Sequence, residues 1–288
     1  MWNKKIRNKA KNLNKSVIFP EGKDKRIIKA ALKLKKKKII DPTVIAEQPV
    51  KGINTIKSGG NELNLGARLV SEGKYDALVA GAINTTANVI RTGMKEIGIH
   101  PSTSTVSSFF FIQSREKNVG ERGAFLFADC AVVPNPDYHQ LADIAYTTAH
   151  SARAILGWEP RVAFLSFSTK GSSAHQSIEK VYKAMEELKS RKVDFDFDGE
   201  LQLDTAIIPQ VAEYKDPDGI LKGRANILIF PELNSGNIGY KISERIGGSK
   251  AVGPILQGYK KPINDLSRGC SVEDIMDVAA FSAVMTEL

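Results

Sequence analysis

The chain has 288 residues, of which 42% are hydrophobic and 25% charged, a composition typical of a globular protein long enough for two domains. Two cysteines without a CxxC motif and four histidines without ligand spacing exclude a disulfide framework and a zinc site, and they fit a reducing cytoplasm. The N-terminus lacks an apolar signal core, and no run approaches the roughly 18 apolar residues of a membrane span. The sequence therefore predicts a cytoplasmic protein with no membrane partner.

The net charge of +9 is concentrated at the N-terminus. Residues 1–60 contain 17 lysines and arginines against 4 acidic residues, so the rest of the chain is net acidic. The run Lys35 to Lys38 closes a helical pattern, where lysines complement the helix dipole, and it has neither the aromatic residues nor the recognition motif of a nucleic-acid site. We therefore expect no nucleic-acid partner. The alternative to a solvated helix end is that this basic face attracts an anionic ligand over a long range.

The first regular elements form a βα unit, with a strand at Ser16–Phe19 and a helix from Asp24 to Lys35. Residues 39–64 are ambiguous: the apolar run at their start could hold a strand, whereas KSGGNELN is typical of a loop. A buried strand at Ala77–Ala80 and a helix from Asn84 to Ile97 follow.

Strands and helices continue to alternate toward the C-terminus. The pattern predicts strands at Thr103–Ile112, Gly123–Ala128, Arg161–Phe167, near Leu201 and at Ala225–Phe230, and helices at Asp137–Leu156, Ser173 to about Arg191, and about Asn237–Ile246. This alternation indicates parallel sheets flanked by helices, with sites at the carboxyl ends of the strands. No GxGxxG motif opens a βαβ unit and no Walker P-loop is present, so neither NAD nor ATP is implied.

A polar string precedes the final helix. Ser271 to Asp274 has the form of a capping box, which predicts that this helix begins at Ser271. Upstream, Asn264, Asp265, Ser267 and Arg268 lie where backbone N–H groups and the helix dipole favour an anion, and an arginine there can bind two phosphate oxygens. The alternative is an ordinary turn, a cap acid and a solvated arginine.

Four segments together resemble the phosphate acetyltransferase family. They are KPINDLSRGCSVEDI, FPELNSGNIGYK (Phe230 to Lys241), LSFSTKGS (Leu165 to Ser172) and DALVAGAINTTANVIR (Asp76 to Arg91), with a shorter match at VIFPEGKDKRIIKAA. Members of this family interconvert acetyl phosphate plus coenzyme A with acetyl-CoA plus phosphate. They are usually longer between residues 39 and 75, where this chain lacks several tens of residues.

The resemblance implies two α/β domains, each a mainly parallel sheet flanked by helices, with an active-site cleft between them. Because Gly157 ends a predicted helix and Pro160 follows, we place the boundary there. The first domain then comprises residues 1–157, shortened around 39–75 and completed by the C-terminal segment 256–288. The second comprises residues 158–255.

The reaction implied by the resemblance needs a base and an anion site. The coenzyme A thiol, with a pKa of about 8.5 if it behaves like cysteine, must lose its proton before it attacks. By resemblance Asp274 takes that proton, Arg268 and Arg91 hold the phosphoryl group, and Ser267 donates a hydrogen bond to developing charge. For Arg91 the alternative is a surface arginine paired with a carboxylate.

Two further segments are candidates for binding phosphate or coenzyme A. Ser168, Thr169, Lys170 and Gly171 could bind phosphate through backbone amides and the lysine, or only connect a strand to its helix. The second set is Asn234, Gly236 and Asn237, whose residue types suit either close approach to a ligand or a plain turn.

The remaining expectations concern partners and alternatives. Cys270 is interpreted as a packed side chain, and the acids Asp198, Glu200 and Asp204 as a turn and strand, so we expect no metal and no bound cofactor, with coenzyme A as a substrate. The resemblance suggests a homodimer acting in acetate metabolism. The alternatives are a phosphate butyryltransferase or another acyl length, and a non-catalytic acyl-CoA-sensing domain on the same fold.

Overall fold

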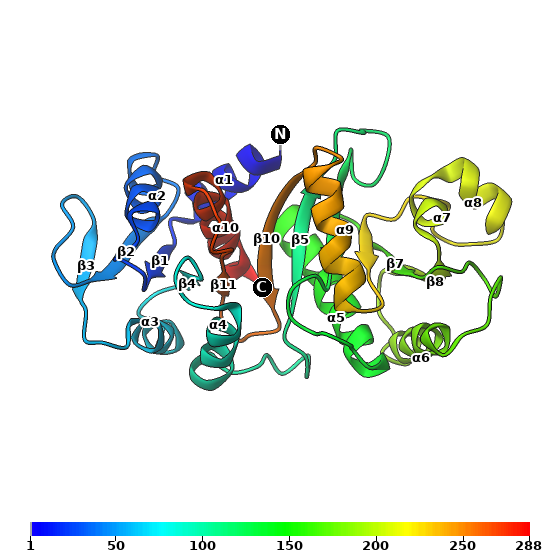
Figure 1. The fold of residues 1–288 in the computed structure, drawn as a ribbon, viewed down its shortest axis with the longest axis horizontal. Helices are drawn as coiled ribbons and strands as arrows, with labels where there is room; N and C mark the ends of the chain where they lie inside the picture. The colour runs from blue at the N-terminus through cyan, green and yellow to red at the C-terminus, as the bar shows by residue number, and fades with distance from the viewer. Residues whose placement is uncertain (1) are drawn as a thin grey trace. The chain divides into compact units, whose positions relative to one another are not determined.

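The computed structural model describes residues 2–288 and divides into two compact units (Figure 1). Unit 1 contains the chain up to Ser102 together with Val252–Leu288, and unit 2 contains Thr103–Ala251. In the part of the chain that the structure describes, no helix is long and apolar enough to cross a membrane.

Unit 1 is built on a five-stranded sheet in the order β11-β4-β1-β2-β3, in which all neighbours run parallel. Its strands are β1 (Ser16–Phe19), β2 (Asp41–Ala46), β3 (Asn54–Lys57), β4 (Ala77–Ala80) and β11 (Ile263–Asp265). Strand β4 is fully buried, as expected for a central parallel strand covered on both faces.

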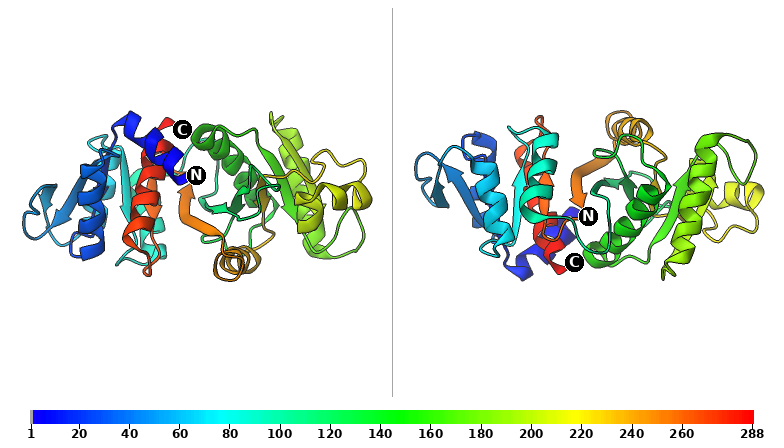
Figure 2. Two further views of the ribbon diagram at one scale, coloured as in Figure 1. Left: turned by 90° about the horizontal axis from the view of Figure 1, so that it is seen from above. Right: turned by 90° about the horizontal axis from the view of Figure 1, so that it is seen from below.

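Helices cover both faces of this sheet (Figure 2). They are α1 (Trp2–Leu13), α2 (Lys25–Lys36), α3 (Glu62–Ser71), α4 (Thr86–Thr92) with a π-helical turn at Gly93–Ile97, and α10 (Val272–Val284) with a final 3₁₀ turn at Met285–Glu287. Helix α10 contacts α1, α2, β1 and β4 and is buried at every position from Ile275 to Val284. Because this stretch is buried on all sides, the C-terminal helix lies inside unit 1, where its one buried acid, Asp277, pairs with Arg7 of α1.

The connection between β2 and β3 is short. These strands are parallel neighbours, yet only residues 47–53 join them, whereas a parallel crossover usually needs a dozen or more residues and a helix. The ambiguous region, residues 39–64, therefore holds two strands and the first residues of α3. Strand β3 lies at the sheet edge with none of its residues buried.

The second sheet has six strands in the order β10-β5-β6-β9-β7-β8. Strands β5 to β9 lie within unit 2, and β10 begins at the end of unit 2 and continues into the returning segment at Val252. Strands β5 and β6 are antiparallel, and the pairs β6–β9, β9–β7 and β7–β8 are parallel. The strands are β5 (Ser107–Gln113), β6 (Ala124–Ala128), β7 (Arg161–Leu165), β8 (Asp196–Leu201), β9 (Ile227–Ile229) and β10 (Lys250–Gln257). The helices are α5 (Tyr138–Ser151) with a π-helical turn at Ala152–Leu156, α6 (Gln176–Ser190), α7 (Leu203–Ile207), α8 (Pro209–Lys215) and α9 (Leu233–Arg245).

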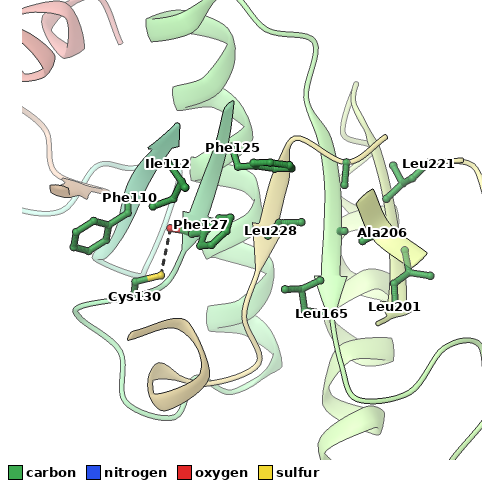
Figure 3. Close-up of a cluster of buried hydrophobic side chains, with 12 residues drawn as sticks. Phe110, Ile112, Phe125, Phe127, Cys130, Leu165, Leu201, Ala206, Leu221 and Leu228 are labelled. Atoms are coloured by element: carbon green, nitrogen blue, oxygen red, sulfur yellow. Dashed lines mark hydrogen bonds between the residues drawn. The ribbon is translucent and has the colours of Figure 1, made fainter. Parts of the chain in front are cut away.

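A cluster of buried hydrophobic side chains, three of them phenylalanines, forms part of the core of unit 2 (Figure 3). Phe110 and Ile112 of β5 pack with Phe125 and Phe127 of β6, and Leu228 of β9 continues the layer. The mainly parallel sheets with flanking helices confirm the predicted fold class.

The division into units differs from the predicted boundary near residue 157. Strands β5 and β6 and helix α5 belong to unit 2, because β6 pairs with β9 and β9 with β7 in one sheet. The units therefore divide at residues 102 and 103, and the returning segment begins at Val252 instead of residue 256. Pairing between strands distant in sequence, which local patterns do not reveal, sets this boundary.

Three predicted helix or strand starts are wrong. Helix α6 is capped by His175, whose Nδ1 accepts from the amide of Ser177 at 3.2 Å, and not by Ser173. Helix α9 starts at Leu233 because the Glu232 carboxylate caps it. Strand β5 starts at Ser107, since Ser104 and Thr105 bind the carboxylate of Asp143 instead of a neighbouring strand.

Candidate active site

Three neighbouring strands of unit 1 end at one edge of its sheet. Strands β11, β4 and β1 are parallel, with Asp265 opposite Ala80 and Ile18 opposite Leu78. The segments that follow them, residues 266–271, 81–85 and 20–24, therefore leave the sheet at the same edge. Ligand sites of α/β proteins form at such carboxyl ends.

The turn after β11 presents two of the predicted site residues to solvent. Ser267 and Arg268 are exposed, and the turn is closed by a hydrogen bond of 2.9 Å from the amide of Cys270 to the carbonyl of Ser267. The amide of Gly269 also donates to Ser267 Oγ at 3.3 Å. The exposed guanidinium and hydroxyl are thus held on a short, defined turn.

The side chain of Arg26 holds this turn in place through its backbone carbonyls. Its Nη1 donates to the carbonyls of Arg268 at 2.8 Å and Cys270 at 2.9 Å, and its Nη2 donates to the carbonyl of Ala82 at 3.2 Å. An ion pair of 2.7 Å with Asp24 completes its contacts. One guanidinium therefore joins all three strand-end segments, a contribution that the sequence analysis missed.

A buried glutamate organises the segment after β4. The carboxylate of Glu21, which is 4% exposed, accepts from the four successive amides of residues 81–84 at 2.7 to 3.0 Å. It also accepts from the side chain of Asn84 at 2.9 Å. These amides are consequently occupied by a protein carboxylate. The sequence analysis did not identify Glu21; an acid between Pro20 and Gly22 after a buried strand was the available signal.

Asp274 takes part in the predicted capping box at the start of α10. Its Oδ2 accepts from the amide of Ser271 at 2.9 Å and from Ser271 Oγ at 2.8 Å, and its own amide donates to Ser271 Oγ at 3.2 Å. The box is confirmed, and the structural role of Asp274 as a cap is therefore real. Both side-chain bonds use Oδ2, so the box does not engage Oδ1.

Arg91 lies on α4, whose N-cap is Thr85. The side chain is exposed, and its Nη2 donates to Asn88 Oδ1 at 3.0 Å. This partner is a neutral amide on the same helix, so the full charge of the arginine is presented at the surface. A hydrogen bond joins α4 to the sheet, because Thr86 Oγ1 donates to Asp265 Oδ2 of β11 at 2.6 Å.

The other predicted binding residues belong to unit 2. In the loop from Ser168 to Ser172, the amides of Thr169 and Lys170 donate to Ser172 Oγ and the carbonyl of Glu200. The amide of Gly171 donates to Glu200 Oε1 at 3.2 Å, and the Lys170 ammonium pairs with Asp198. The donors expected for phosphate are therefore engaged within the protein.

Asn234, Gly236 and Asn237 lie in the first turns of α9 and not in a free loop. A Cβ at Gly236 would lie 2.3 Å from the carbonyl oxygen of Asp129, so the close approach that glycine permits is to the protein backbone. Asn237 donates to the carbonyl of Cys130 at 2.9 Å.

The interpretation of Cys270 as a packed residue agrees with its surroundings. Its side chain is buried, and burial raises the pKa of the thiol to about 11 despite the nearby Arg26. A thiol in this state is a poor nucleophile at neutral pH.

Among residues 2–288, no group of three or more His, Cys, Asp or Glu could hold a metal ion. Asp198 pairs with Lys170, and Asp204 with Lys215 at 2.8 Å.

Asp265 is a buried acid whose charge affects stability. Burial raises its pKa from 3.8 to about 7, opposed by the Thr86 hydrogen bond and reinforced by the charge of Glu21. Because the pKa is higher in the folded state, the stabilisation from proton binding is complete below about pH 4 and is lost as the pH rises to about 7. Relative to Asp265→Asn, the parent should lose up to about 1.4 kcal/mol of unfolding free energy per pH unit in that window. Urea titrations at several pH values measure this difference, and parallel pH curves for the two proteins would contradict it.

Comparison with known proteins defines the class. A sequence model of the family described as Phosphate acetyl/butaryl transferase matches residues 1–64 and 53–283. The phosphate acetyltransferase of Thermoanaerobacterium thermosaccharolyticum is 41% identical, with 97% of each chain covered. That of Treponema pallidum is 49% identical over 78% of this chain and 68% of its own. A phosphotransacetylase structure from Streptococcus pyogenes superposes with a TM-score of 0.89 at 34% identity, covering 98% of this chain and 97% of that one.

These matches identify a transferase with an α/β fold. The chain belongs to the Phosphate acetyl/butaryl transferase family. The 319 aligned residues of the Thermoanaerobacterium match exceed the 288 of this chain, so the alignment includes positions that this chain lacks. The two segments of this chain that match the family's sequence model overlap at residues 53–64, next to the short connection between β2 and β3.

Proposed function

We propose that this enzyme transfers the acetyl group between acetyl phosphate and coenzyme A, with Asp274, Ser267, Arg268 and Arg91 as its catalytic residues. The observation that carries the assignment is the exposed Ser267–Arg268 turn, which Arg26 fixes at the carboxyl ends of β11, β4 and β1, with Asp274 six residues after Arg268 in the first turn of α10. The names and high coverage of the relatives favour acetyl phosphate as the substrate.

In the proposed reaction, a carboxylate oxygen of Asp274 accepts the thiol proton of coenzyme A. The sulfur forms a bond to the carbonyl carbon of acetyl phosphate, and the bond from that carbon to the bridging oxygen breaks. Phosphate leaves with the electron pair, while Arg268 and Arg91 stabilise its growing charge. Ser267 donates a hydrogen bond to the developing oxyanion. Both substrates are bound together, and no acyl-enzyme forms.

Coenzyme A contacts are proposed in unit 2. Lys170 supplies a cation if it exchanges Asp198 for a phosphate, and Ser168, Thr169 and Gly171 line the same loop. Asn234, Gly236 and Asn237 at the start of α9 form the second contact, where helix-terminal amides favour an anion. We further propose a cytoplasmic homodimer. The reduced, buried cysteines support the compartment, and the exposed Ile238 and Ile242 of α9, with Ile246 at its C-cap, offer an apolar stripe.

The deciding experiment is coenzyme A-dependent release of phosphate from acetyl phosphate by the purified 288-residue chain. Comparison with propionyl and butyryl phosphate gives the acyl preference, and a higher kcat/KM for butyryl phosphate would favour the butyryltransferase alternative. If coenzyme A and acyl-CoA bind but no acyl phosphate turns over, the acyl-CoA-sensing alternative replaces the enzyme.

The reaction is expected to need no metal ion, because the arginines supply the positive charge that stabilises the departing phosphate. Dialysis against a chelator should leave the rate of phosphate release unchanged. A rate that disappears on dialysis and returns with one divalent cation would contradict this expectation.

A further inference from the structure

The hydrogen bond between Thr86 and Asp265 joins two elements that carry predicted phosphate-binding residues. Asp265 ends β11 and is 1% exposed, and its Oδ2 accepts from Thr86 Oγ1 at 2.6 Å. Ser267 and Arg268 follow Asp265 within three residues, and Thr86 is the first residue of α4, which carries Arg91. The bond thus links the first residue of α4, which carries Arg91, to the last residue of β11, which precedes the turn with Arg268.

Both partners are held firmly. A Cβ at Gly81, where φ is +109°, would lie 2.3 Å from Asp265 Oδ1, so the segment after β4 packs directly on the carboxylate. Leu266 is buried beyond Asp265, and Val89 and Thr92 bury the inner face of α4. With the backbone fixed on both sides, a side-chain bond at this point can set where α4 lies on the sheet edge.

We infer that Thr86 and Asp265 form a positioning pair that sets the location of Arg91 relative to Arg268, an inference that rests on the proposed function. Neither residue needs to touch substrate. Their bond acts through α4, and a displacement of about 1 Å in a substrate-holding group can cost on the order of 100-fold in rate. The competing possibility is that this bond only adds to the stability of unit 1.

Thr86→Val removes the hydroxyl while keeping the shape of the side chain, and Thr86→Ser restores the donor. Thr92→Val is the matched control, because Thr92 Oγ1 on the same helix donates to Asn64 Oδ1 at 3.2 Å, away from the strand-end segments. We expect Thr86→Val to lower kcat/KM for acetyl phosphate about tenfold or more, with Thr86→Ser and Thr92→Val within about twofold of the parent. Thr86→Ala makes the same test if Thr86→Val does not fold.

A combined variant separates positioning from stability. If Thr86 acts through Arg91, Thr86→Val should cost less than about twofold in an Arg91→Ala background, because residues that act through one another are not additive. Equal losses in both backgrounds, or equal activity of Thr86→Val and Thr92→Val, would overturn the inference. A parent protein without acyl phosphate turnover would instead refute the proposed function, and this inference with it. Thermal melting of every variant confirms that folded proteins are compared.

Discussion

Replacing Arg268 with alanine is expected to lower kcat/KM for acetyl phosphate about 100- to 1,000-fold, because one preorganised charge that stabilises the transition state is commonly worth that much. Arg91→Ala should fall in the same range. Both side chains are exposed, so little folding energy depends on them, and the loss should appear in catalysis and not in melting temperature.

Arg68→Ala serves as the control for this prediction. Arg68 is an arginine of unit 1 whose side chain is 60% exposed and lies 3.8 Å from Glu96, outside the strand-end segments. Its replacement should leave kcat/KM within about twofold of the parent, since exposed ion pairs contribute little. If Arg268→Ala and Arg91→Ala both keep the parental kcat/KM, the assignment of the anion site to these two residues is wrong.

Asp274→Asn separates the two roles of this residue. The amide oxygen can still accept from the Ser271 amide, so the cap should persist and the unfolding free energy should fall by no more than about 1 kcal/mol. The proton acceptor is lost, and general-base catalysis is typically worth about 10²- to 10⁴-fold in rate. Steady-state kinetics at neutral pH, with circular dichroism and melting of the same samples, measures both effects.

Two observations would test the base assignment further. Raising the pH toward the thiol pKa of about 8.5 should restore part of the rate of Asp274→Asn, because coenzyme A then arrives as the thiolate. Glu273→Gln removes a carboxylate from the same helical turn, where Glu273 pairs with Arg7 and Lys33, and should retain parental activity. A folded Asp274→Asn protein with parental kcat at pH 7 would end the assignment.

Local patterns predicted the elements that local chemistry determines. The capping box of Ser271 and Asp274 is present because its bonds span three residues. The α5 prediction also holds, with Asp137 as its N-cap and Gly157 in the left-handed conformation at its end. In these places the residues that decide the structure are neighbours in sequence.

Features held by distant contacts were not predictable in the same way. Arg26 binds carbonyls more than 240 positions away, and Glu21 binds amides 60 or more positions away. Helix α1 was not predicted, and its packing against α10, including the ion pair of Arg7 with Asp277, is a contact between opposite ends of the chain. The assembled site therefore depends on pairings that one sequence does not display.

The short link between β2 and β3 has a consequence for how this family varies in length. Sheet order places β3 at the outer edge, with β2 between it and β1, whereas the segments with Glu21, Ala82 and Arg268 follow β1, β4 and β11. Residues 47–53 can therefore be lengthened or shortened without shifting the strands that support the site. The length of the chain in unit 1 can therefore change during evolution while the geometry of the segments after β1, β4 and β11 stays the same.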